Sequence, residues 1–174
     1  GVAAVEDRAL GFALADQTAI VSNDANSGQQ VRLAPGEALF VPPQSRQQRV
    51  ALGPAPAPYY RIALVPAEQA ADAGGDQLLL AGAPFPAPAG AAFDLDLVRA
   101  TLSPGDANRL AAGSAPSLVL VTEGAVEIEA TGALPTRLAA GQAVEVGGAE
   151  IRATGSAPAS FVAAVVGPEV APPP

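Results

Sequence analysis

The sequence predicts an all-β protein built from two related halves. Short runs rich in Val and Leu, at 62–65, 117–121 and 161–166, are bounded by Gly or Pro, which favours buried strands over helices. Residues 125–129 alternate strictly, so that Val126 and Ile128 share one face, as in a half-buried strand. A pattern repeated along the chain is the third observation.

The repeat consists of three matched segments that occur in the same order in both halves. The pairs are 33–41 (LAPGEALFV) with 138–146 (LAAGQAVEV), 5–12 with 121–128, and 53–56 with 155–158. Such order predicts a duplicated unit. The first copy carries a polar insertion over 16–30, in which 23–28 (NDANSG) is typical of a protruding hairpin tip.

Proline and glycine between the copies mark the boundary. We expect a first half over 1–75, a linker over 76–92 that could include an edge strand at 77–80, a second half over 93–168 and a Pro-rich tail over 169–174. The sequence begins with Gly1 and not with an initiator Met, and the residues after Gly1 do not have the pattern of a secretion signal. We therefore expect the chain to be processed or partial.

The composition excludes several chemistries. His, Cys, Met and Trp are absent from the 174 residues, and all nine basic residues are Arg. Ser-His-Asp, Cys-His, Schiff-base and zinc-type sites therefore have no residues to use, and no disulfide can form. We predict no catalytic residue, no metal ligand and no cofactor.

The charge and hydropathy also limit the partners. A formal net charge of −8 argues against nucleic acid and against anionic membrane surfaces, since both would be repelled. No stretch approaches the roughly 20 apolar residues of a membrane-spanning helix.

Two glycine-framed segments of the second half resemble the signature motifs of the cupin superfamily. The first extends from Pro104-Gly105 to Glu123-Gly124, and the second begins at Gly141 and continues through Gly147 and Ala149. In the first half, Gly36 and the pair 42–43 (PP) keep the frame of the second motif. The resemblance implies two double-stranded β-helix (jelly-roll) barrels, the first lacking its opening strands because these would precede Gly1.

The family's metal-ligand positions are filled by residues that cannot bind a cation in the family's way. Ala111 and Gly113 stand where the resemblance places histidines, and Ser117 stands where it places a carboxylate. Arg152 and Gln47 occupy the last ligand position of the second and first halves. The resemblance thus implies metal-free barrels, unless ligands upstream of Gly1 serve the first one.

Three of these residues are candidate ligand-binding residues. The resemblance points Arg152 toward the barrel cavity, where a guanidinium could hold a carboxylate or phosphate. The alternative, which we favour, is a solvated strand face or an ion pair with Glu127 or Glu129. Gln47 and Ser117 would be polar neighbours in such a cavity, or simply hydrogen-bonded core residues.

Two same-face carboxylate pairs could bind a hard cation or act as acid and base. These are Glu127 with Glu129 and Asp94 with Asp96. Side chains two apart on a strand lie about 7 Å from each other, which favours a solvated face.

We therefore predict a non-catalytic, metal-free, cupin-like protein with a binding or assembly role, extracellular or at the cell surface, although a cytoplasmic location stays open. The expected partners are other protein chains, further copies of this chain or a small anionic ligand. The alternative is a cupin-type enzyme that acts on a small acid or sugar. In a third reading, the exposed edge of an incomplete first barrel pairs with another chain.

Overall fold

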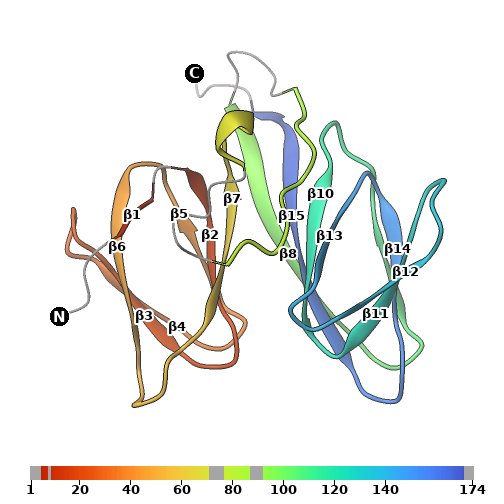
Figure 1. Ribbon diagram of the computed structural model, residues 1–174, viewed down its shortest axis with the longest axis horizontal. Helices are drawn as coiled ribbons and strands as arrows, with labels where there is room; N and C mark the ends of the chain where they lie inside the picture. The colour runs from red at the N-terminus through yellow and green to blue at the C-terminus, as the bar shows by residue number, and fades with distance from the viewer. Residues whose placement is uncertain (1–4, 8, 71–76, 87–91, 171–174) are drawn as a thin grey trace. The chain divides into compact units, whose positions relative to one another are not determined.

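The computed structural model describes residues 5–7, 9–70, 77–86 and 92–170 of the chain. The chain divides into two compact units, Gly1–Pro66 and Ala67–Pro174. Strands make up nearly all the regular structure, with one short 3₁₀ turn at η1 (Ala67–Gln69) (Figure 1). The prediction of an all-β fold is confirmed. No helix in these ranges has the length and apolar character needed to cross a membrane.

The first unit contains seven antiparallel strands in two sheets. They are β1 (Val5–Asp7), β2 (Leu10–Ala15), β3 (Ile20–Asp24), β4 (Gln30–Leu33), β5 (Ala38–Val41), β6 (Ser45–Ala51) and β7 (Tyr59–Leu64). One sheet has the order β1-β6-β3-β4 and the other the order β5-β2-β7.

The second unit contains eight antiparallel strands in two sheets of four. They are β8 (Ala92–Leu102), β9 (Ala107–Leu110), β10 (Ser117–Glu123), β11 (Ala125–Ala130), β12 (Thr136–Ala139), β13 (Ala143–Val146), β14 (Ala149–Ala153) and β15 (Ala159–Val170). The sheet orders are β12-β11-β14-β9 and β13-β10-β15-β8.

The two units share one topology. The order β4-β3-β6-β1 matches β12-β11-β14-β9, and β5-β2-β7 matches β13-β10-β15, as the colours of Figure 1 let the reader follow within each unit. The second unit adds β8 beside β15, and no described strand takes that place beside β7. This architecture confirms two jelly-roll barrels, of which the first lacks an opening strand among the described residues.

Each unit has its own core between its sheets. In the second unit, thirteen buried residues form one cluster, with Val119 and Phe161 from one sheet and Val126 and Ile151 from the other. In the first unit, Ala15, Ile20 and Leu33 form a buried cluster, and Phe12, Ala13, Leu14 and Val41 are also buried.

The hairpin tip predicted at 23–28 is present between β3 and β4. Asp24 Oδ1 accepts hydrogen bonds from the backbone N–H groups of Asn26 (2.8 Å) and Ser27 (3.4 Å), and Gly28 has φ 72°. The short Asx side chain and the glycine together allow the tight reversal.

Two expectations about segments are wrong. Residues 77–80 form no strand, and no secondary structure is assigned over 77–86. Within it, Ala83 N–H donates to Glu145 on β13 at 2.6 Å, and a Cβ on Gly82 would lie 2.2 Å from the same carboxylate. Residues 5–12 do not match 121–128, because the strand equivalent to β10 is β2, over Leu10–Ala15.

Candidate functional site

Backbone hydrogen bonds allow the two units to be compared residue by residue. Gly36 N–H donates to Ala15 O, and Gly141 N–H donates to Val121 O, both at 2.8 Å. Ile20 pairs with Leu33 and Ala51, as Val126 pairs with Leu138 and Ala153. These matches fix which residues occupy equivalent places on the inward faces of the sheets.

A polar row lies on the inward face of β6 and β3 in the first unit. Ser45, Gln47 and Ser22 are only 4%, 4% and 1% exposed. Ser22 Oγ donates to Gln47 Oε1 at 2.9 Å. Ser45 Oγ is buried and has no hydrogen-bond partner among the described residues. Because a buried polar atom without a partner is unfavourable, Ser45 Oγ costs the first unit some stability.

Arg49 extends the same row at the alternate position of β6. Its Nε is buried, and its guanidinium carbon lies 5.1 Å from the centroid of the Tyr59 ring on β7. A cation over an aromatic face is held by the ring's quadrupole. Ser45, Gln47 and Arg49 thus present hydroxyl, amide and guanidinium groups along one inward strand face.

The equivalent places in the second unit are apolar. Ala149 replaces Gln47, Ile151 replaces Arg49 and Ile128 replaces Ser22, because Ile128 pairs with Ile151 as Ser22 pairs with Arg49. All three residues of the second unit belong to its core cluster. The second barrel is therefore filled by hydrophobic packing where the first one is polar.

Arg61 on β7 carries a second guanidinium of the first unit, and the residue is exposed. It lies opposite Ala13 on β2, two residues before Ala15 of the core cluster. A shallow hollow next to it is also lined by Gly11, Val41 and Ala63. The hollow encloses no space for a water-sized molecule, so it is a surface depression and not a ligand cavity.

Arg152 does not point into the barrel, contrary to what the resemblance implied. Its side chain is 50% exposed, forms an ion pair with Glu150 and donates to Gly105 O at 3.2 Å. Five residues separate Val41 from Gln47, whereas two separate Val146 from Ala149. Because successive side chains of a strand point to opposite faces, this difference of three residues places Arg152, which lies 105 residues after Gln47, on the opposite face of its strand.

Ser117 lies at the start of β10, where it is 2% exposed and faces Val146 across the ladder. Its equivalent in the first unit is Gly11, where a Cβ would lie 2.0 Å from Ile62 O. Ser117 and Gln47 lie in different units.

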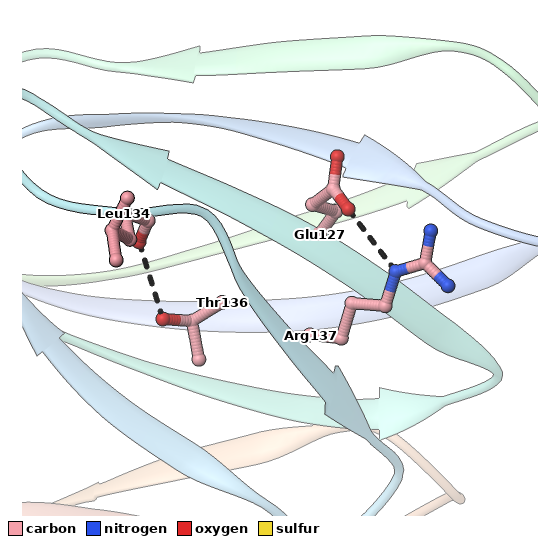
Figure 2. A network of polar contacts seen from close by, with 4 residues as sticks. All are labelled: Glu127, Leu134, Thr136 and Arg137. Carbon is pink, nitrogen blue, oxygen red and sulfur yellow. Dashed lines mark hydrogen bonds and ion pairs between the residues drawn. The ribbon is translucent and has the colours of Figure 1, made fainter.

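The carboxylate pairs lie on solvated faces. Glu127 on β11 forms an ion pair with Arg137 on β12 at 3.1 Å, as Figure 2 shows. Beside it, Thr136 Oγ1 donates to Leu134 O at 3.5 Å. Asp94 and Asp96 on β8 are exposed. In the described part of the chain, no three His, Cys, Asp or Glu side chains form a group that could hold a metal ion.

One carboxyl of the first unit has a shifted pKa. Burial raises the pKa of Asp16, which follows β2. Burial, together with the charge of Asp16, also raises the pKa of Tyr60 on β7. Both groups lie outside the polar row.

The comparisons with known proteins concern the fold. No family sequence model and no curated protein matches the chain. Among solved structures, an oxalate decarboxylase superposes with a TM-score of 0.61 at 13% identity, over 97% of this chain and 66% of the other. A variant of Bacillus subtilis oxalate decarboxylase superposes with a TM-score of 0.59 at 12% identity, over 95% and 65%. The fold is that of the cupins.

This cupin fold confirms the resemblance read from the glycine-framed motifs. The chain spans less than two thirds of the length of these decarboxylase structures, at 65 to 66%. At 12 to 13% identity the similarity shows a shared fold and is no evidence of a shared activity.

The sequence reading missed four of the five residues around the first unit's polar row. It named Gln47, and it did not name Ser22, Ser45, Arg49 or Arg61 as candidates. The signal was available as alternation, since 47 and 49 share one face and are polar, whereas the matching residues 149 and 151 share one face and are apolar.

Proposed function

We propose that this cupin-fold protein is a non-catalytic binding module whose first barrel holds a small anion on Ser45, Gln47 and Arg49. The observation that carries the proposal is the contrast between equivalent positions. Ser22 and Gln47 are buried and Arg49 is partly buried in the first unit, whereas the matching residues Ile128, Ala149 and Ile151 of the second unit belong to a hydrophobic core. Burying polar groups costs stability, so their presence in only one of two related barrels supports a binding role there.

The chemistry of the row favours an anion. A guanidinium, a hydroxyl and an amide all donate hydrogen bonds, and Arg matches a carboxylate or phosphate in two-point geometry. Asp24 is in register with Gln47, and its Oδ1 accepts two backbone N–H groups in the hairpin tip.

The charge distribution supports the same assignment. Residues 1–66 contain five Arg and five acidic residues, whereas residues 67–174 contain four Arg and twelve acidic residues. The net charge of −8 therefore comes from the second unit alone. A neutral first unit does not repel a small anion as the second one does.

The test is a thermal-shift titration with acetate, phosphate and sulfate, followed by calorimetry. We expect at least one anion to raise the melting temperature of the wild type, since a ligand that binds only the folded state stabilises it. Arg49→Gln should abolish the shift. Arg46→Gln is the matched control, because Arg46 lies on the same strand but is exposed on its outer face.

Equal shifts in both variants would show that the anions bind elsewhere, and no shift in the wild type would reject the proposal. An enzymatic role on a small acid is the second candidate, and oxalate is the acid that the structural neighbours' names suggest. We expect that oxalate is not consumed, because the row contains no residue able to act as a general base at neutral pH. A fall in the oxalate concentration after this chain is added would favour the enzymatic role.

A further inference from the structure

The ring of Tyr59 lies against the Arg49 side chain within the first unit. Arg49 belongs to β6 of one sheet, and Tyr59 belongs to β7 of the other. The guanidinium carbon of Arg49 lies over the ring, 5.1 Å from its centroid. The pair therefore links the two sheets of this unit.

Strand register places both residues on the faces of the sheets that hold the core. Tyr59 pairs with Ala15 and packs against the buried cluster to which Ala15 belongs. Arg49 pairs with Ser22, which is 1% exposed. Both Tyr59 and Arg49 are half-buried. The contact between the ring and the guanidinium is therefore internal to the first unit.

The second unit has an aromatic ring at the matching place but an aliphatic residue beside it. Phe161 pairs with Val121 on β10 as Tyr59 pairs with the equivalent residue of β2. Ile151 is the equivalent of Arg49, and Ile151 and Phe161 belong to one core cluster. An aromatic residue at this place is thus a packing feature of both units, whereas only in the first unit does it adjoin a cation.

An aromatic ring can hold a guanidinium without using its hydrogen bonds. The ring's quadrupole attracts the positive charge, so the contact itself occupies none of the guanidinium N–H groups. An Arg side chain that is already held in one orientation also loses less conformational entropy when it binds a ligand. A ring beside Arg49 therefore favours anion binding even if the ring does not touch the anion.

We propose that Tyr59 is a positioning residue, whose ring holds the Arg49 guanidinium in the orientation in which it binds an anion. This inference rests on the anion-binding function proposed for Ser45, Gln47 and Arg49, and it adds a residue that acts through Arg49. Because the attraction comes from the ring, Phe at position 59 serves as well as Tyr, and an aliphatic residue does not.

The first test measures the affinities for acetate, phosphate and sulfate by calorimetry. Tyr59→Leu should weaken the binding of any anion that the wild type binds by about 5- to 30-fold, since a partly desolvated cation–π contact contributes this much. Tyr59→Phe keeps the ring and should bind as tightly as the wild type. Tyr60→Leu is the matched control, because its side chain lies on the opposite face of β7, and it should also bind like the wild type.

The second test needs no anion. In the nuclear magnetic resonance spectrum of the wild type, nuclear Overhauser effects should connect the Tyr59 ring protons with the Arg49 side chain. The Arg49 Nε–H signal should shift in Tyr59→Leu and stay in place in Tyr59→Phe, because only the first variant removes the ring. Absence of the Overhauser effects in the wild type would overturn the proposal, even if Tyr59→Leu does not fold.

The affinities separate this inference from the function on which it rests. If the wild type binds an anion and Tyr59→Leu binds it equally well, the positioning role is refuted and the anion site stays in place. Equal losses in Tyr59→Leu and Tyr60→Leu would also refute the positioning role, because impaired packing would then be the cause. If the wild type binds none of the three anions, the anion-binding function is itself refuted, and the role of Tyr59 with it.

Discussion

Two buried serines of the polar row should respond to alanine substitution with opposite signs. Ser22 and Ser45 are equally small and almost equally buried, at 1% and 4% exposure. Ser22 Oγ donates to Gln47 Oε1, so Ser22→Ala leaves a buried amide oxygen without its donor and should destabilise the first unit by about 1–2 kcal/mol. Ser45 Oγ has no partner, so Ser45→Ala removes a desolvation penalty and should stabilise the unit by about 1 kcal/mol.

The assay can be confined to the first unit. The chain contains no Trp and only two Tyr, and both, Tyr59 and Tyr60, lie on β7. Tyrosine fluorescence during thermal or urea unfolding therefore reports on this unit. For a domain of this size, each kcal/mol moves the melting temperature by about 4–8 °C. The two variants should melt on opposite sides of the wild type in buffer free of small anions.

A change in the same direction would refute the reasoning. If both variants were destabilised, Ser45 Oγ would have a hydrogen-bond partner in solution, and the binding proposal would lose its support from an unpartnered hydroxyl. If neither moved, the polar row would not be buried.

Two further predictions test the second barrel and the titrating pair. Ile151→Ala should destabilise the second unit by about 2–5 kcal/mol, whereas Arg152→Ala should change its stability by no more than about 0.5 kcal/mol. Unfolding followed by circular dichroism measures both changes. A larger effect of Arg152→Ala would show that Arg152 is part of the core. In a Tyr59→Phe background, Asp16→Asn should lower the pKa of Tyr60, because the Asp16 charge raises that pKa in addition to burial. The absorbance of tyrosinate during a pH titration measures the change. An unchanged pKa would show that burial alone is responsible.

Local periodicity was sufficient to predict much of the fold. Val126 and Ile128 are 0% and 2% exposed, and Glu127 lies on the other face, as alternation requires. The repeat 33–41 with 138–146 also falls on equivalent strand pairs, β4-β5 and β12-β13. These features depend only on neighbours in sequence and on the side-chain period of a strand.

The site could not be predicted as well, because it depends on loop length and on missing neighbours. A loop three residues shorter before β14 reverses the faces, which moved Arg152 outward and put Ile151 inside. The run 62–65 was predicted to be a buried strand, yet Leu64 is 38% exposed, and among the described strands β7 pairs only with β2. The assignment of Gln47 and Ser117 to a ligand, and the extracellular or cell-surface location, remain predictions.

The most direct measurement is the nuclear magnetic resonance of the arginine side chains during an anion titration. The nine Arg Nε–H groups give few signals, and alanine variants can assign those of Arg49 and Arg152. Our account predicts a saturable shift of the Arg49 signal with acetate or phosphate, while the exposed Arg152 signal stays in place. A silent Arg49, or equal unsaturable shifts of both arginines, would contradict it.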